Sequence, residues 1–290
     1  MIETKDLKII ADSKTSIDSE TRFWEFVVDY SKTHFFGVRF DNLTKKTALK
    51  IVRNFLTERH NQKSRKVFFT NVHTIYLAGK NPVFAQTVNK ADLVLPDGSG
   101  LKIAGRIFSK PVKENLNGTD FTPLILETAL KLGSKIYLLG ATQEVITKCV
   151  SRLEIEYPGL KIVGFHSGFF SSSDEAELIS EIKNISPDIL LIAMGSPKQE
   201  MFAEKIAGQL NNTVCCAIGG FFDFITEERK RAPLFIRKSG LEWLFRFFQD
   251  PKTKWDRIII EIPVFLLSVF TARFFTNSIY SSSDRRPSCG

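Results

Sequence analysis

Few cysteines occur in this sequence, and their spacing excludes the common thiol motifs. The four thiols belong to Cys149, Cys215, Cys216 and Cys289, and no C-x-x-C pair is present. Cys215 and Cys216 are neighbours in an apolar run, which favours buried thiols in a reducing compartment. The opening residues, MIETKDLKIIADSK, lack an apolar region of secretory length. The sequence therefore predicts a cytoplasmic protein.

Several nucleotide-binding and catalytic motifs are also missing. The segment GSGLKIAG (98–105) contains G-x-G, but its third glycine is too distant for a dinucleotide fingerprint. Neither a P-loop G-x4-G-K-[ST] nor a G-x-S-x-G nucleophile elbow occurs. The histidines have no zinc-ligand spacing, so each is expected to be a surface or core residue. They are His34, His60, His73 and His166, and His73 alone lies near a predicted strand end.

Length, composition and charge indicate a globular protein with a basic C-terminal third. A chain of 290 residues, 43% hydrophobic and 25% charged, can form one large α/β domain or a domain with an appendage. The net charge of +8 is unevenly spread, because ten basic and only four acidic residues lie between Arg229 and Arg273. Such a segment attracts nucleic acid, an anionic bilayer or a phosphorylated substrate.

Strand-like and helical segments alternate along most of the chain. Strands are predicted at 35–40, 66–71, 92–97, 135–140, 160–168, 188–195 and 213–220, with helices at 41–59, 81–91, 98–108, 141–159, 171–187 and 196–210. This alternation predicts an α/β fold with a Rossmann-like parallel sheet flanked by helices. The predicted domains are an N-terminal extension (1–34), an α/β core (35–228), a basic and apolar appendage (229–276) and a disordered tail (277–290).

One acidic residue has an unusual place in this pattern. The stretch ADLVLPDGSGLKIAG (91–105) begins as a strand, breaks at Pro96 and places Asp97 among three glycines. Asp-Gly is ordinary turn chemistry, and Asp can cap the N–H groups that open a helix. The alternative is a general base, because ligands of parallel sheets bind outside the carboxyl ends of the strands. Other segments at predicted strand ends favour the base: Thr70–Asn71, Gly140, Gly195–Glu200 and Gly219–Asp223.

Two predicted helices begin at glycine turns, Gly140–Thr142 and Gly195–Pro197. Their free N–H groups and partial positive charge could hold a diphosphate. The alternative is that glycine serves only the chain reversal between strand and helix. Lys198, Gln199 and Glu200 add a cation, an amide and an acid to the second turn, and we expect them to face a pocket.

Seven segments, in their order and spacing, resemble motifs of the WecG/TagA/CpsF glycosyltransferases. They are ADLVLPDGSGL, LNGTD, IYLLG, MGSPKQE, AIGGFFDF, RKRAP and GLEWLFR. The resemblance spans about Phe35 to Phe275. It implies inverting, metal-independent transfer of a sugar, of the N-acetylmannosamine type or glucose-like, from a UDP-sugar to a polyprenyl-diphosphate-linked sugar. The implied setting is cell-surface polysaccharide or teichoic acid synthesis, with no cofactor.

The resemblance also assigns roles to individual residues. The base of the PDG motif falls on Asp97, the glutamine of the PKQE motif on Gln199, and the strand-end asparagine on Asn71. The acid after the double glycine falls on Asp223, and the arginine of the LEWLYR motif falls on Arg246. The remaining candidate substrate contacts are Gly140, Gly195, Lys198, Glu200, Gly219, Gly220 and Arg257.

Two positions depart from the family pattern. The family often has T-x-N at the first strand end, whereas Thr70 directly precedes Asn71 here; Thr70 remains a catalytic candidate. The residue before LNG is often an arginine that is thought to assist the diphosphate, and here it is Asn115. Lys113 is the candidate replacement for that arginine.

The segment IPVFLLSVFTA (262–272) is an apolar run of eleven residues. A membrane span needs about 20 residues, so this run is too short to cross a bilayer. Together with the basic stretch before it, it indicates an interfacial element on an anionic membrane surface. The resembled family has a C-terminal appendage that docks on the membrane and helps to close the site. The alternative is a core-packing helix with a solvated basic face. We expect a peripheral protein on the inner face of the cell membrane.

Two other function classes stay open. A UDP-sugar-binding α/β module that has lost catalysis would explain Asn115 and the displaced Thr70. A nucleic-acid binder would use the basic C-terminal third, but no binding-fold signature appears, so no nucleic-acid partner is expected. The sequence leaves open the donor sugar, the acceptor saccharide and whether the chain forms a homo-oligomer.

Overall fold

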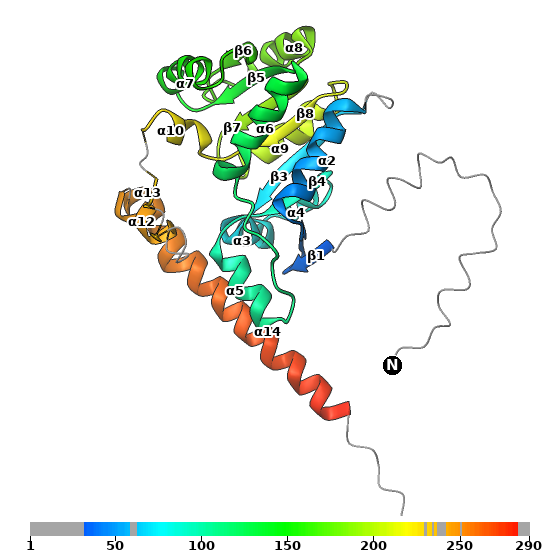
Figure 1. Cartoon of the computed structure of the whole chain (residues 1–290). Coiled ribbons are helices and arrows are strands. Elements are labelled where there is room, and N and C mark those ends of the chain that lie inside the picture. The colour runs from blue at the N-terminus through cyan, green and yellow to red at the C-terminus, as the bar shows by residue number, and fades with distance from the viewer. Residues whose placement is uncertain are drawn as a thin grey trace, which may run out of the picture.

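The computed structural model describes residues 32–58, 63–228, 231–233, 235–236, 242–249 and 251–283. The predicted N-terminal extension therefore lies outside the described residues except for its last three, and so do residues 284–290 of the predicted tail. The described chain forms a six-stranded parallel sheet with helices on both faces (Figure 1). This confirms the predicted Rossmann-like α/β fold.

The strand order in the sheet is β4-β3-β8-β7-β5-β6. The strands are β3 (Arg65–Thr70), β4 (Leu93–Pro96), β5 (Lys135–Gly140), β6 (Lys161–His166), β7 (Ile189–Ala193) and β8 (Val214–Ala217). The helices of the α/β core are α2 (Lys45–Thr57), α3 (Val72–Lys80), α4 (Pro82–Asn89), α5 (Ser99–Ile107), α6 (Gly118–Leu132), α7 (Gln143–Glu156), α8 (Glu175–Ile185), α9 (Lys198–Ala207) and α10 (Phe221–Ile225).

Different helices cover the two faces of the sheet. α2, α6 and α7 pack in one hydrophobic cluster, while α3, α4, α8 and α9 pack in the other. Successive residues of β3 enter opposite clusters, with Val67 and Phe69 on one side and Phe68 on the other. A strand buried on both faces has a nearly continuous apolar sequence, which is why such strands of the sheet could be predicted. The edge strand β6 is only partly buried.

The N-terminal strand prediction needs a correction. A single strand was predicted at 35–40, but the structure has an antiparallel hairpin of β1 (Lys32–Phe35) and β2 (Val38–Asp41). Both turn residues, Phe36 and Gly37, have positive φ values of 49° and 79°, as a two-residue hairpin turn requires. The carboxylate of Asp41 accepts a hydrogen bond from Val94 N at 2.8 Å, which attaches the hairpin to β4.

A C-terminal helical segment follows the core. It contains α12 (Glu242–Gln249), α13 (Pro251–Asp256), a π-helical turn η1 (Arg257–Glu261) and the long α14 (Ile262–Ser283). Figure 1 shows α14 running along α5 and projecting beyond the core. The apolar run at 262–272 is thus only the first half of a helix. Helix α14 extends to Ser283 and so includes residues 277–283, the beginning of the predicted tail.

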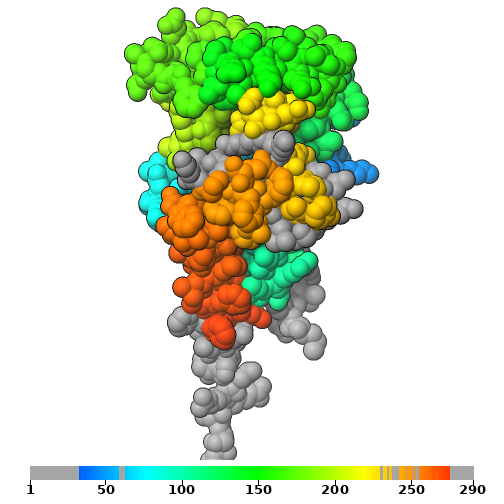
Figure 2. All heavy atoms as spheres, turned by 90° about the vertical axis from the view of Figure 1, so that its left-hand side faces the viewer, coloured from blue at the N-terminus to red at the C-terminus, as the bar shows by residue number. Residues whose placement is uncertain are grey.

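Helix α14 has two different sides. Phe265 and Val269 are buried in the same hydrophobic cluster as Leu101 and Ala104 of α5. Val264, Leu267, Phe270 and Phe274 are exposed. One side therefore packs on the core, as the core-packing alternative expected, and the other presents apolar side chains to the surroundings. Figure 2 shows the orange-to-red atoms of this helix at the molecular surface. Among the described helices, none combines the length and hydropathy needed to cross a membrane.

Candidate active site

Most of the predicted site residues follow four neighbouring strands. Asp97 comes directly after β4, and Thr70 and Asn71 stand at the end of β3. Gly219, Gly220 and Asp223 follow β8, and the segment Gly195–Glu200 follows β7. These strands are adjacent in the order β4-β3-β8-β7, and all of them are parallel. Their carboxyl ends therefore share one edge of the sheet, where α/β proteins bind their ligands.

Asp97 is held beside Asn71 at this edge. Asn71 Nδ2 donates a hydrogen bond to Asp97 Oδ2 at 3.4 Å, and Asp97 N donates to the carbonyl of Thr70 at 2.7 Å. The cap position of α5 is Gly98, which has no side chain to cap the helix. The Asp97 carboxylate, one residue earlier, contacts the amide that ends the neighbouring strand.

Asn71 connects this carboxylate to helix α3. It is the N-cap residue of α3, and its Oδ1 accepts hydrogen bonds from Thr74 N at 3.1 Å and Thr74 Oγ1 at 3.3 Å. A single amide thus caps a helix with its oxygen and contacts Asp97 with its nitrogen. Asn71 therefore links the Asp97 carboxylate to the first turn of α3.

Asn115 supports the same loop from the other side. Its Oδ1 accepts a hydrogen bond from Gly98 N at 2.6 Å, and Leu116 N donates to the carbonyl of Pro96 at 2.8 Å. The residue that departs from the family arginine therefore fixes the backbone just after Asp97. Lys113, the candidate replacement, has an exposed side chain, and its backbone N–H donates to Asn42 Oδ1 at 2.7 Å.

The start of α9 carries a buried pair of polar side chains. Gln199 and Glu200 are only 4% and 1% exposed, and Gln199 Nε2 donates to Glu200 Oε1 at 2.8 Å. Ser196 Oγ donates to the same carboxylate oxygen at 2.7 Å. Burial raises the pKa of Glu200, and these two hydrogen bonds only partly oppose that effect.

Three buried oxygens at this edge have no hydrogen-bond partner within the described residues. They are Gln199 Oε1, Glu200 Oε2 and Thr70 Oγ1. Helix α9 packs against β3, β7 and β8, so these residues belong to one region of the molecule. An unpaired buried polar atom costs about 1–3 kcal/mol, and such atoms are rare unless they serve a ligand, a water or an ion. They are the strongest candidates for contacts with a substrate.

The remaining predicted site residues have no described contact with Asp97 or Asn71. Lys198 Nζ donates to the carbonyl of Gly168 at 2.8 Å and lies over the Phe170 ring, so it contacts the segment after β6. Gly140 ends β5, and a Cβ there would lie 2.3 Å from Ala193 O, so close backbone packing already requires glycine. Arg246 is part of α12 with its side chain outside the described atoms, and Arg257 is the first residue of η1.

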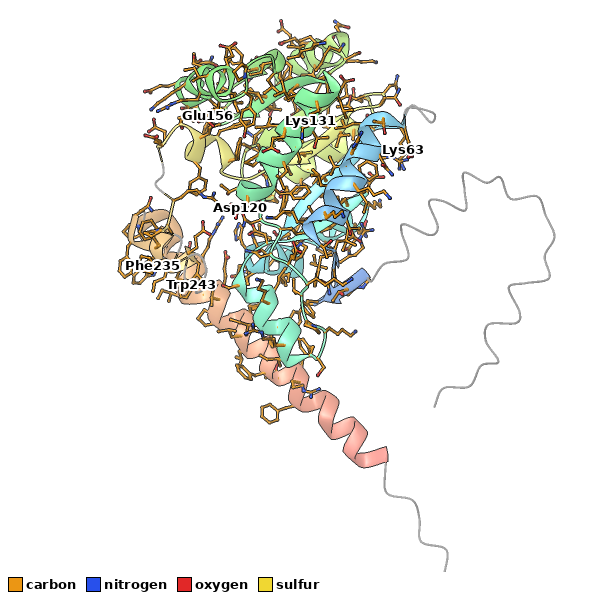
Figure 3. The ribbon with its side chains drawn as sticks, in the orientation of Figure 1. Lys63, Asp120, Lys131, Glu156, Phe235 and Trp243 are labelled. Carbon is orange, nitrogen blue, oxygen red and sulfur yellow. The ribbon has the colours of Figure 1, made fainter. Side chains whose placement is uncertain are left out.

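Two side-chain pairs that involve the later part of the chain were not predicted from the sequence. His73, in the first turn of α3, contacts both carboxylate oxygens of Glu261 through Nδ1, at 2.9 and 2.8 Å. Arg231 Nη2 donates to Asp120 Oδ1 at 2.7 Å, which ties the RKRAP segment to the start of α6. Figure 3 labels Asp120 on the side of the core that faces Phe235 and Trp243 of the C-terminal segment. The pairing of each residue depends on parts of the chain that are distant in sequence.

Comparison with known proteins decides the family. The family described as "Glycosyl transferase WecG/TagA/CpsF family" matches residues 33–279. The chain belongs to this family. A relative from Staphylococcus aureus (strain MW2) is 30% identical over 247 residues, which cover 84% of this chain and 94% of the relative. A relative from Bacillus spizizenii is 30% identical over 192 residues, covering 66% of this chain and 73% of that protein.

Both relatives carry the name N-acetylglucosaminyldiphosphoundecaprenol N-acetyl-beta-D-mannosaminyltransferase. The family membership confirms the resemblance inferred from the seven motifs, and with it a glycosyltransferase on an α/β scaffold. The roles given to individual WecG/TagA/CpsF residues, including Asp97, Gln199 and Asp223, remain predictions.

Proposed function

We propose that this glycosyltransferase moves a sugar from a UDP-sugar to a polyprenyl-diphosphate-linked saccharide, with inversion and without a metal ion or other cofactor. The names of the relatives support a lipid-diphosphate-linked acceptor and a donor of the N-acetylmannosamine type. A glucose-like donor is the alternative sugar. The product would enter a cell-surface polysaccharide or teichoic acid.

The observation that carries the proposal is the contact between Asn71 and Asp97 at the carboxyl edge of the sheet. In the proposed reaction Asp97 removes the proton of an acceptor hydroxyl while its oxygen attacks the anomeric carbon of the donor. The bond from that carbon to the UDP oxygen breaks, and UDP leaves with the bonding electron pair. A direct displacement on the face opposite UDP inverts the anomeric configuration, and a positioned carboxylate is a suitable general base for it.

The unpaired buried oxygens of α9 and β3 support a sugar as the bound group. Gln199 Oε1 and Glu200 Oε2 can each accept a hydrogen bond, and Thr70 Oγ1 can donate or accept one. A sugar presents several hydroxyl donors, and an N-acetylated sugar adds an amide N–H. Binding such a group would satisfy atoms that the described protein leaves unpaired. Arg246, Arg257 and Lys113 are the proposed cations for the diphosphate, with Asp223 and the glycines at 140, 195, 219 and 220 lining the donor site.

The C-terminal segment supports attachment to a membrane surface. Helix α14 exposes Val264, Leu267, Phe270 and Phe274 on the side opposite its buried residues. Basic residues between Arg229 and Arg273 outnumber acidic ones by ten to four. Apolar side chains beside an excess of positive charge favour reversible docking on an anionic bilayer. We therefore place the enzyme peripherally on the inner face of the cell membrane, where a polyprenyl-linked acceptor is accessible.

A panel of radiolabelled UDP-sugars, offered with a synthetic lipid-diphosphate-N-acetylglucosamine acceptor, tests the function. We expect transfer from one donor, a product of inverted anomeric configuration by NMR, and a rate that EDTA leaves unchanged. UDP affinity is measured in parallel by isothermal titration. Tight UDP binding without transfer to any lipid-linked acceptor would instead identify a catalytically altered UDP-sugar-binding module.

A further inference from the structure

A hydrogen-bonded pair of side chains connects the C-terminal segment to helix α3, whose cap residue Asn71 contacts Asp97. Glu261, the last residue of η1, is 6% exposed, and both of its carboxylate oxygens contact Nδ1 of His73. His73 lies in the first turn of α3, two residues after the cap residue Asn71. A buried carboxylate needs such a partner, because an unpaired buried charge is strongly destabilising. The pair therefore holds η1 against the start of α3.

The packing around this pair reaches both sides of Asp97. Helix α3 begins just after β3, and α5 begins just after Asp97. A Cβ on Gly100 of α5 would lie 2.3 Å from Val72 Cγ2 of α3, so the two helix starts touch closely. It would also lie 3.8 Å from the ring of Phe265 in α14. The C-terminal segment thus contacts both helices whose first turns flank Asp97.

We propose that the His73–Glu261 pair positions Asp97 for the transfer reaction by holding the first turn of α3, and with it Asn71, when the C-terminal segment is seated. His73 and Glu261 are then positioning residues that act through Asn71. The π-helical turn that ends at Glu261 fits this role, because such local insertions in helices are often found at functional sites. The catalytic consequence rests on the proposed function, whereas the coupling between η1 and α3 does not.

The experiment compares four full-length variants with the wild type: His73→Ala, Glu261→Ala, the double variant, and Asp256→Ala as a matched control. Asp256 is an exposed carboxylate in the same segment, just before η1. We measure kcat and KM for the donor, UDP affinity, and hydrogen exchange of the Thr74 and Ile75 amides. These amides report directly on Asn71, because they donate to its side chain and its carbonyl.

Each single variant should lower kcat by up to about 100-fold, the effect of a small misplacement at a reacting centre, with little change in KM or UDP affinity. Exchange at Thr74 and Ile75 should become faster. The kcat of the double variant should be no lower than that of the less active single variant, because each single substitution already removes the same contact. Asp256→Ala should match the wild type. A kcat equal to that of Asp256→Ala, or a fall in kcat without faster exchange at these amides, would overturn the proposal.

Two further outcomes are informative. If the single variants do not fold, a variant with the two residues exchanged, His73→Glu with Glu261→His, restores the contact between a histidine and a carboxylate. Recovery of folding and kcat in this variant supports the proposal, and failure to recover overturns it. If the wild type transfers no sugar, the proposed function fails, and hydrogen exchange alone decides the coupling. Unchanged exchange at Thr74 and Ile75, or acceleration spread evenly over the core, would then refute it.

Discussion

Asn71 contacts Asp97 with its amide nitrogen while its amide oxygen caps helix α3. The end of β3, the start of α3 and the loop after β4 are therefore linked by one side chain. This link gives Asp97 a defined orientation at the carboxyl edge of the sheet. It also separates two effects of mutation, because the capping oxygen and the contacting nitrogen can be removed independently.

Asp97→Asn tests the general base. Asparagine keeps the size of the side chain but does not accept a proton from an attacking hydroxyl. We expect transfer to slow by roughly 10²- to 10⁴-fold, as is usual on loss of a general base, with UDP affinity retained. Single-turnover transfer and isothermal titration measure the two quantities. Near-normal turnover would remove Asp97 from the chemistry.

Asn71→Ser and Asn71→Ala separate positioning from capping. The serine hydroxyl can still cap helix α3, but serine has no side-chain amide to donate a hydrogen bond to Asp97. Alanine loses both functions, and loss of a cap typically costs about 1 kcal/mol of stability. We expect both variants to lower kcat, and only Asn71→Ala to lower the free energy of unfolding in urea. Asn81→Ala, which removes the cap of α4 through Phe84 N, is the control for stability alone. Wild-type kcat in the serine variant would show that the contact with Asp97 has no catalytic role.

The parts of the fold that could be predicted are those whose sequence pattern reflects burial. Strands β3, β4, β5, β7 and β8 have nearly continuous apolar runs, because both of their faces are covered; the edge strand β6 is only partly buried. Helices α3 and α6 were not predicted, although each begins directly after a capping asparagine, Asn71 or Asn117. An asparagine at a strand end is equally compatible with a loop. For α14, the apolar run stops at Ala272, but a helix can continue with polar residues beyond it.

In the candidate site, too, some residues could be predicted from the sequence and others could not. Asp97, Asn71 and Gln199 could be located from strand ends and from the family resemblance. The pair of His73 and Glu261 could not, because 188 positions separate its members in the sequence. Their contact depends on where the C-terminal segment packs. The three unpaired buried oxygens also require coordinates, since a sequence does not show which atoms lack partners.

Glu200→Gln tests the burial of this carboxyl group through the pH dependence of stability. The pKa of Glu200 is raised above its usual 4.5, so over the range between 4.5 and the raised value the folded state binds more protons than the unfolded state. The free energy of unfolding therefore falls as pH rises through that range. Glutamine does not titrate, and its oxygen can still accept the hydrogen bonds from Ser196 and Gln199.

We expect the thermal midpoint of the wild type, relative to Glu200→Gln, to be highest below pH about 4.5 and to fall as the pH rises above it. Thermal unfolding of both proteins across a pH series measures this difference. Glu177→Gln, at an exposed position on α8, should show no such trend. A difference between wild type and Glu200→Gln that is independent of pH would contradict the assignment.

The exposed side of α14 provides the test of membrane docking. Phe265 and Val269 pack on α5, so truncation of the helix would also uncover the core; substitutions on the exposed side avoid this. Leu267 and Phe270 are 65% and 51% exposed, and burying such a side chain in an apolar environment contributes about 1.5–3 kcal/mol. Leu267→Asn with Phe270→Asn should therefore reduce sedimentation with anionic liposomes at least tenfold, with unchanged thermal stability. Ile155→Asn, at a site on α7 that is 72% exposed, is the matched control and should sediment like the wild type.

Raising the salt concentration should weaken liposome binding of the wild type and both variants, because salt screens the attraction between the basic residues and the anionic lipids. Equal sedimentation of the double variant and the Ile155 variant would mean that this side of α14 does not meet the bilayer.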